Sequence, residues 1–548
     1  MSHPQDHSTH IVANQPPART QIDEFTENVP LAEGVLRHDA AWAMEQLSEI
    51  GRLVGGAGFQ RAAQLANAHE PVLRSHDKWG NRIDEVDYDA GYHEVIASAV
   101  AHGAHTAAWA NPRPGANVAR AAVFMLHAQI EAGHACPVSM THAVVPALRQ
   151  QPELAAIWLP RVYSRGYDGA LAAPASKPGA LFGMAMTEKQ GGSDVRANTT
   201  RAQPAGDGTF LITGHKWFCS APMSDAFLVL AQTAKGLGCF LVPRVLDDGT
   251  RNVFRIQRLK DKLGNRSNAS AEVEFDGTFG FAVGDLDRGV RTIIEMVART
   301  RLDCVLGTAA GMRQCVAEAA WHVRHRAAFG RTLVDQPAMR NVVADLALES
   351  EAATATALRL ARAHDDDVSE QEAAFRRLAT AVEKYWVCKR GPGHAYEALE
   401  CLGGNGYTED FPLARRYREQ PVMAVWEGSG NVIALDTVRA ITREAGAFDA
   451  FDAEVSLAAG GDAVLDGHLE RTRHAVLSLG RLDADAAALQ ARRLTEDLAL
   501  ALQASLLVRY APSAVADAFI RSRLAPSRSW QYGNLSVSAD LGGILERA

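Results

Sequence analysis

The sequence predicts an α+β multidomain chain, in which a helical domain, a β domain and a second helical domain are followed by an additional helical domain. Apolar residues recur at spacings of three and four before residue 183 and again after residue 286. Between them the spacing changes to two, as in short half-buried strands. A further run with helical spacing follows residue 446. We therefore expect the domains 1–183, 184–285, 286–446 and 447–548.

The first two domains contain distinct local signals. Residues 35–182 are mostly helical in pattern, with alanine-rich segments such as 119–132, and the Asn-Pro-Arg-Pro-Gly run at 111–115 indicates a loop. In the β domain, short β-type runs are bounded by Gly, Asp or Pro, which favours a small barrel or sandwich. These runs are 209–213, 227–230, 239–242 and 272–275.

The last two domains are predicted to be helical. Ser369 followed by Glu372 is typical of a capping box that opens a long helix, and Gly403-Gly404 indicates its end. In the additional domain, leucines recur every four residues, which predicts an apolar helix face that packs against another element. These are Leu494, Leu498, Leu502 and Leu506.

Composition excludes several classes of protein. The 548 residues are 47% apolar, which is ample for a buried core, and the formal charge of −8 provides no global field for nucleic acid or anionic lipid. Seven cysteines lack C-x-x-C spacing, which argues against a metal site and a disulfide framework. The start of the chain does not resemble a secretion signal, and no apolar run is long enough for a membrane span. We expect a cytoplasmic location.

Residues 426–431 read Trp-Glu-Gly-Ser-Gly-Asn and contain the most informative carboxylate of the chain. A carboxylate beside an indole ring loses solvation, which raises its pKa and makes it a better proton acceptor near neutrality. Glu427 is therefore a candidate general base. The alternative is an ordinary helix start, in which Ser429 or Asn431 caps the first amides.

Four further motifs occur in a fixed order around this one. Residues 186–195 read Met-Thr-Glu-Lys-Gln-Gly-Gly-Ser-Asp-Val, and residues 214–220 read Gly-His-Lys-Trp-Phe-Cys-Ser. Residues 325–330 read His-Arg-Ala-Ala-Phe-Gly and precede Gln336, and residues 402–407 read Leu-Gly-Gly-Asn-Gly-Tyr. Five motifs in one order are far more specific than any one of them.

In these motifs the chain resembles the acyl-CoA dehydrogenases. Within that family it resembles the AidB-like, DNA-alkylation-response branch. The features that carry this second resemblance are the sequence of 186–195, the run 258–270, the Trp before Glu427 and the additional C-terminal segment. The resemblance implies an N-terminal helical domain, a central β-barrel or sandwich, a four-helix bundle and an FAD cofactor. It also implies an oxidoreductase in which Glu427 removes an α-proton from an acyl thioester. The family's other base position corresponds to Thr300, which cannot serve as a base.

The resemblance assigns cofactor contacts residue by residue. Thr187 would contact the pyrimidine side of the flavin and Trp217 would pack beside the ring, whereas Cys219, a weak donor, replaces the threonine that usually bonds near N5. Asp303 could orient Arg301, or form a structural ion pair. The complete set of predicted FAD contacts is Met184, Met186, Thr187, Gly192, Ser193, Trp217, Phe218, Cys219, Ser220, Arg326, Gln336, Trp426, Gly428, Ser429 and Asn431.

The resemblance also implies an oligomer. Arg326 and Gln336 correspond to residues that reach the FAD of a neighbouring subunit, and an arginine suits a pyrophosphate because its planar fork makes paired bonds. We therefore expect a homotetramer. The alternative is that Arg326 is a solvated residue near a helix end.

Two functions from different classes remain open. The first is dehydrogenation of an acyl-CoA thioester. The second, implied by the AidB-like resemblance, is sequence-independent binding of double-stranded DNA, with protection against or destruction of alkylating agents. From Gly446 onward there are ten Arg, no Lys and thirteen acids, a net charge of about −3, which weighs against DNA. One stretch without acids contains Arg521, Arg523 and Arg528 beside Trp530, and is the candidate DNA contact.

Overall fold

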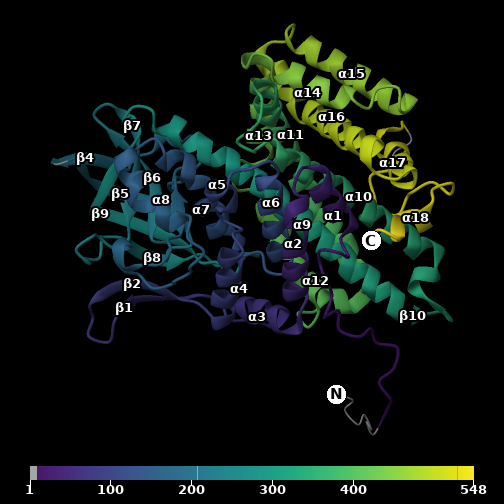
Figure 1. Cartoon of the computed structure of the whole chain (residues 1–548), viewed down its shortest axis with the longest axis horizontal. Helices are drawn as coiled ribbons and strands as arrows, with labels where there is room; N and C mark the ends of the chain where they lie inside the picture. The colour runs from purple at the N-terminus through teal and green to yellow at the C-terminus, as the bar shows by residue number, and fades with distance from the viewer. Residues whose placement is uncertain (1–8, 207, 527–528) are drawn as a thin grey trace.

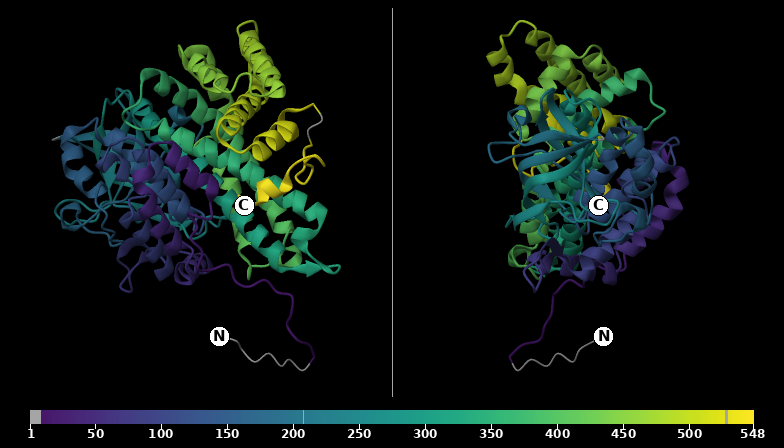
Figure 2. Two further views of the ribbon diagram at one scale, coloured as in Figure 1. Left: turned by 45° about the vertical axis from the view of Figure 1, so that its right-hand side comes forward. Right: turned by 90° about the vertical axis from the view of Figure 1, so that its left-hand side faces the viewer.

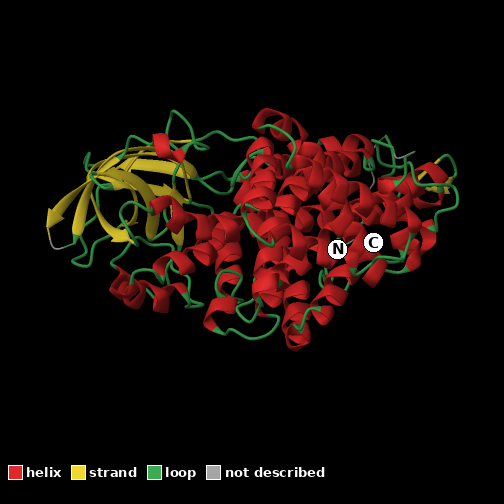
Figure 3. Cartoon of the chain, turned by 90° about the horizontal axis from the view of Figure 1, so that it is seen from above, coloured by secondary structure: helices red, strands yellow, loops and turns green. Residues whose placement is uncertain are grey.

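The computed structural model describes residues 9–206, 208–526 and 529–548 of the chain. The β domain lies at one end of the molecule and the helices fill the rest (Figure 3). The helices of the additional C-terminal segment lie against the central bundle, on the side away from the sheet (Figure 1). The chain is therefore α+β, with segregated helices and strands, as the sequence predicts.

The N-terminal part is helical apart from one antiparallel hairpin, β1 (Val72–His76) and β2 (Arg82–Asp87). This hairpin lies inside the segment predicted to be mostly helical, so the prediction is wrong there. Its strands are short and largely polar, which hides their period of two. The helices are α1 (Val29–Arg37), α2 (Met44–Val54), α3 (Ala57–Ala68), α4 (Ala90–Ala101), α5 (Ala107–Ala110), α6 (Ala116–Ala128), α7 (Ala135–Leu148) and α8 (Pro152–Val162).

The β domain contains one seven-stranded sheet that closes on itself. Along the path β3-β6-β4-β5-β9-β7, an additional pairing of β6 with β7 completes a barrel, and β8 pairs with β9. The four predicted β runs lie within β5, β6, β7 and β9, so these predictions are confirmed. The strands are β3 (Phe182–Ala185), β4 (Arg201–Gly206), β5 (Thr209–Ser220), β6 (Ala226–Thr233), β7 (Gly236–Pro243), β8 (Arg255–Leu259) and β9 (Ser270–Val283).

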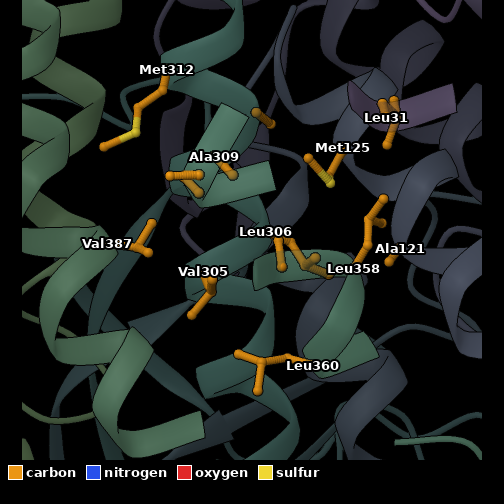
Figure 4. Close-up of a cluster of buried hydrophobic side chains, with 14 of the residues drawn as sticks. Leu31, Ala121, Met125, Val305, Leu306, Ala309, Met312, Leu358, Leu360 and Val387 are labelled. Carbon is orange, nitrogen blue, oxygen red and sulfur yellow. The ribbon is translucent and has the colours of Figure 1, made fainter. Parts of the chain in front are cut away.

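The central bundle is built around the 37-residue helix α9 (Gly289–His325). Figure 4 shows Leu306 and Ala309 of α9 among side chains from α6, α10 and α11. Ser369 accepts a hydrogen bond from the amide of Glu372, which confirms the predicted start of α11. The other elements are β10 (Ala327–Ala328), β11 (Arg331–Thr332), α10 (Pro337–Arg362), α11 (Glu370–Glu400), α12 (Pro412–Met423) and α13 (Gly430–Arg443).

The additional segment packs on this bundle through α16 (Ala484–Tyr510). Its four-residue leucine series is buried, as predicted, and α16 contacts α10, α11 and α13. In the left view of Figure 2, the yellow helices of this segment lie against the green helices of the bundle. The remaining helices are α14 (Ala447–Ser456), α15 (Ala463–Leu479), α17 (Ser513–Phe519) and α18 (Leu541–Leu545). Among the residues described, no helix is both long and apolar enough to cross a membrane.

Candidate active site

Glu427 lies in the short loop between α12 and α13. Its φ of 58° is in the left-handed region, and Gly428 follows with a φ of 110°. A non-glycine residue in this region is strained, so the surrounding structure must hold it in place. The loop therefore presents Glu427 in one defined orientation.

The Glu427 carboxylate is oriented by the long helix α9. The Thr300 hydroxyl donates a hydrogen bond of 2.7 Å to Oε2, and Arg301 Nε donates one of 3.1 Å to the backbone oxygen of Glu427. Burial raises the pKa of the Glu427 carboxyl above its usual value, although the Thr300 bond and the charges of Arg301 and Lys384 oppose the increase. A carboxylate with a raised pKa is suited to accept a proton near neutrality.

The loop leads into a helix start, as the alternative predicts, but the predicted side-chain cap is not formed. Ser429 is the N-cap residue of α13, but its side chain makes no capping bond. The Asn431 Oδ1 atom instead accepts a 2.7 Å hydrogen bond from Arg492 of α16. The side chains that could cap α13 are therefore not used to do so.

The two motifs of the β domain meet beside each other. The Trp217 amide donates to the Thr187 carbonyl at 2.8 Å, and a Cβ atom on Gly192 would collide with the Thr187 side chain, so the glycine-rich loop folds back on Thr187. Met184 lies at the end of β3, and Met186 packs at the edge of the neighbouring core. Ser193 is exposed at the surface of the loop.

A buried ion pair holds these motifs together. Lys216 Nζ lies 2.9 Å from Glu188 Oε1, and both side chains are fully buried. Although burial acts in the opposite direction, hydrogen bonds from Gln190, Thr199, Thr200 and Lys216 hold the pKa of Glu188 well below its usual value. The sequence interpretation missed this pair, although both residues lie inside the motifs.

The end of β5 separates its side chains into two environments. Phe218 is 50% exposed, and Lys260 Nζ lies 3.1 Å from the centroid of the Trp217 ring. Cys219 instead belongs to the barrel core, where burial raises the pKa of its thiol to about 12. The Ser220 hydroxyl lies 3.2 Å from that of Ser270. At the position where the family usually has a threonine, this chain therefore has a thiol that lies in the barrel core. Phe218 and Ser220 lie on either side of it at the strand end.

Arg326 and Gln336 lie apart from these motifs, around the β10–β11 hairpin that follows α9 (Figure 1). Arg326 donates to the Asn14 carbonyl, and Gln336 donates to the Ala328 carbonyl at 2.9 Å. At the hairpin tip, Phe329 is 98% exposed with a φ of 52°. The described chain does not bring Arg326 or Gln336 to its own Glu427 loop.

The proposed pairing of Asp303 with Arg301 is wrong. Asp303 forms a buried ion pair with Arg120 of α6, and Arg301 pairs with Asp436 of α13 at 2.7 Å. Residues two positions apart on a helix point to different faces, so Asp303 and Arg301 cannot share a partner surface.

The predicted DNA contact is also wrong for Arg523. Its side chain is only 11% exposed and lies 2.5 Å from Asp345 and 3.0 Å from Glu349 of α10. Arg521 pairs with Asp462 at 2.8 Å. The stretch lacks acids in sequence but not in space, because its carboxylate partners come from other helices. Arg528 lies outside the described residues.

A cavity of about 530 Å³ lies between α4, the β1–β2 hairpin and the β5–β6 loop. Aromatic side chains of Tyr88, Tyr92 and Tyr167 line it, and its wall includes Pro137 and Ala221. Ala221 directly follows Ser220 of the flavin-type motif, so the cavity adjoins that strand end.

Comparison with known families covers most of the chain. Residues 14–169 match the AidB N-terminal domain family, residues 183–278 match the acyl-CoA dehydrogenase middle domain, and residues 287–442 match the acyl-CoA dehydrogenase C-terminal domain.

Individual relatives agree with these matches. The putative acyl-CoA dehydrogenase AidB of Escherichia coli is 46% identical over 80% of this chain and 82% of its own length. The structure of Caenorhabditis elegans ACDH-11 in complex with C11-CoA has a TM-score of 0.84 at 24% identity, over 100% of this chain and 93% of that one. A Bacillus anthracis acyl-CoA dehydrogenase complexed with FAD has a TM-score of 0.65 at 14% identity, covering 79% and 81%.

Proposed function

Because the chain belongs to the acyl-CoA dehydrogenase family, in its AidB-like branch, we propose that it dehydrogenates an acyl-CoA thioester between the α and β carbons, with Glu427 as the base. The protein is an FAD-dependent oxidoreductase. The observation that carries the proposal is the Thr300–Glu427 hydrogen bond, because it fixes one carboxylate oxygen and leaves the other for a substrate proton.

The residues around the strand ends fit a flavin. Trp426 Nε1 is buried and has no hydrogen-bond partner among the described residues, which is expected if it donates a hydrogen bond to a bound ligand. Thr187, Trp217 and Phe218 would line the ring, and Ser220, Gly428 and Ser429 would lie beside it. When bound, FAD supplies the acceptor for the hydride that leaves the β carbon.

The base step follows from the surroundings of Glu427. Thr300 holds Oε2, so Oε1 is the oxygen that takes the α-proton. Since the raised pKa makes the carboxylate a stronger base than an exposed glutamate, proton removal becomes less uphill. Thr300 itself has no basic atom; we assign it a positioning role. The cavity beside Ala221 is the candidate site for the rest of the substrate.

An anaerobic titration tests this proposal. Purified yellow protein is mixed with a panel of acyl-CoA thioesters that includes C11-CoA, and flavin absorbance is followed. We expect at least one thioester to bleach the flavin. If no thioester does so although FAD is bound, the dehydrogenase proposal fails; a colourless protein that takes up no added FAD contradicts the flavin contacts.

We also propose a homotetramer in which Arg326 and Gln336 reach the FAD of a neighbouring subunit. The Phe329 side chain at the hairpin tip is 98% exposed, which supports this arrangement, because aromatic residues are enriched where subunits meet. Light scattering measures the mass directly, and a stable monomer that retains FAD would refute the proposal.

The structure supports duplex DNA binding less than it supports dehydrogenation. Arg523 is neutralised by two carboxylates, and the segment after Gly446 has a net charge of about −3. Phosphate neutralisation supplies most of the affinity for a duplex, so these groups offer little. A gel-shift experiment with a duplex fragment tests this function. Binding at low salt that is lost as the salt concentration rises would support it.

A further inference from the structure

A buried lysine of α11 contacts the loop that carries Glu427. Lys384 is 1% exposed, and its Nζ atom donates to the Trp426 carbonyl at 2.8 Å and to the Gly428 carbonyl at 2.5 Å. Among the residues described, it makes no ion pair with a carboxylate. Other buried lysines of the chain do: Lys216 pairs with Glu188 and Lys177 pairs with Asp225. Lys384 therefore differs from these lysines, because its ammonium group bonds two backbone carbonyls instead of a carboxylate.

The two carbonyls bonded by Lys384 lie on either side of Glu427. Glu427 and Gly428 both have positive φ values, so this part of the backbone needs an external support. Lys384 bridges the loop from the α11 side, while Arg301 holds the Glu427 carbonyl from the α9 side. The strained residue is thus bonded from two helices.

Few charged groups face the Glu427 carboxylate. Arg301 of α9 and Lys384 of α11 are both positive, and each favours the ionised carboxylate. The thiols of Cys136 on α7, Cys304 on α9 and Cys388 on α11 also lie near this pair, but burial raises their pKa values, so they stay neutral. Lys384 is therefore one of two cations that act on the proposed base.

We propose that Lys384 is a positioning residue for Glu427, which fixes the strained loop through its two flanking carbonyls and so keeps the carboxylate aimed at the substrate. This inference rests on the proposed function, since it gives Lys384 a role only through Glu427. It predicts that Lys384 affects proton removal more than cofactor binding.

The test combines substitutions at both positions. Lys384→Met removes the charge and the donors, Lys384→Arg retains both, and Lys389→Met is the matched control, because Lys389 lies on the same helix, is exposed and makes no hydrogen bond to the loop within the described chain. Each variant is prepared alone, and Lys384→Met is also combined with Glu427→Gln. FAD content and melting temperature are measured first. The rate of flavin bleaching by C11-CoA, or by whichever thioester of the panel reduces the wild type fastest, is then followed from pH 5 to 9.

We expect Lys384→Met to retain FAD but to bleach about 10²-fold more slowly, as expected for a displaced catalytic group, with the acid side of its pH profile moved to higher pH. Lys384→Arg should recover part of the rate, and Lys389→Met should resemble wild type. In the Glu427→Gln background, Lys384→Met should have little further effect, because the group through which it acts is absent.

Three results overturn the inference. They are a wild-type rate and pH profile in Lys384→Met, losses that add fully in the double variant, and loss of FAD as the sole defect of both Lys384 variants. If no thioester of the panel bleaches the wild-type flavin, the proposed function fails and this inference fails with it.

Discussion

Glu427 differs from an ordinary surface glutamate in its backbone, its hydrogen bond and its charge environment. The left-handed φ fixes the direction of the side chain, Thr300 occupies one oxygen, and burial raises the pKa. Each feature makes the carboxylate a better placed or stronger base. Together they make Glu427, and not Thr300, the proposed base.

Replacement of Thr300 by valine tests the positioning role. Thr300→Val removes the hydroxyl but keeps the shape, so the carboxylate loses the bond, worth about 1.5–3 kcal/mol, that fixes the orientation of Oε2. We expect FAD binding to persist and bleaching by a thioester at pH 7 to slow by about 10-fold or more. Thr356→Val is the matched control, since that buried hydroxyl bonds a carbonyl of its own helix. Equal rates for wild type and Thr300→Val would remove Thr300 from the site.

The pH dependence of bleaching reports the state of Glu427. The base works only when it is deprotonated, so kcat/KM falls as pH decreases through its pKa in the free enzyme. Because that pKa is raised, the fall should begin at a pH above the ordinary value of 4.5. Stopped-flow measurement of bleaching against pH checks this. A rate that stays constant down to 4.5 would show that Glu427 is not buried as described, or is not the base.

At the scale of elements, α11 joins the loop that carries Glu427 to the additional segment. Lys384 contacts the Glu427 loop, and the preceding residue, Glu383, is buried against α16, where its carboxylate accepts a hydrogen bond from Gln503 at 3.3 Å. Burial raises the pKa of Glu383 well above its usual value. A carboxyl that burial makes harder to ionise therefore lies at the contact between the bundle and the additional helices.

This contact predicts a pH-dependent loss of stability. At a pH between the unfolded and folded pKa values of Glu383, the folded protein binds more protons than the unfolded chain. The contribution of Glu383 to the free energy of unfolding is therefore fully present below the unfolded pKa and declines as pH rises through the folded pKa. We expect Glu383→Gln to melt at the same temperature as wild type near pH 4.5 and at a higher temperature at pH 8. Thermal melts across this range measure the difference.

Glu349→Gln provides a control of opposite sign. Although burial alone would raise it, the charges of Arg390 and Arg523 hold the pKa of Glu349 down to about 2. Its contribution to stability is therefore present above the unfolded pKa, and the substitution should lower the melting temperature at pH 8. If Glu383→Gln instead melts below wild type at pH 8, the carboxyl is ionised and paired in solution.

The strands and helix starts that follow local rules could be predicted from the sequence. The runs in β5, β6, β7 and β9 are short, rich in apolar and β-branched residues and bounded by turn-forming residues, and Ser369 with Glu372 satisfies a spacing rule. The contacts of Lys384 and the Lys216–Glu188 pair could not, because they depend on how distant segments pack. Arg523 shows the same limit: its acidic partners belong to α10, more than 170 residues earlier in the chain.

At the scale of the whole molecule, the hairpin β10–β11 projects from the end opposite the β domain (Figure 1). The residues that suit a pyrophosphate therefore lie far from the loop that carries Glu427. An assembly in which each hairpin reaches another subunit would complete the cofactor site, whereas a monomer would leave Arg326 and Gln336 without that role.

Substitution at the hairpin tip tests this assembly. Phe329→Glu places a charge where we propose a subunit contact, so we expect a smaller mass by light scattering and a loss of bound FAD. Val537→Glu, which changes an equally exposed apolar residue in the additional segment, should alter neither. A Phe329→Glu protein with the wild-type mass and flavin content would place the contact elsewhere.

The most direct test of the central claim, that Glu427 removes the α-proton, is the rate of flavin bleaching with a thioester deuterated at the α carbon. The wild-type protein should bleach more slowly with the deuterated than with the ordinary thioester. Glu427→Gln should bind FAD and slow bleaching by at least about 10²-fold, because the amide keeps the shape but lacks basicity. A Glu427→Gln protein that bleaches at the wild-type rate would contradict the account.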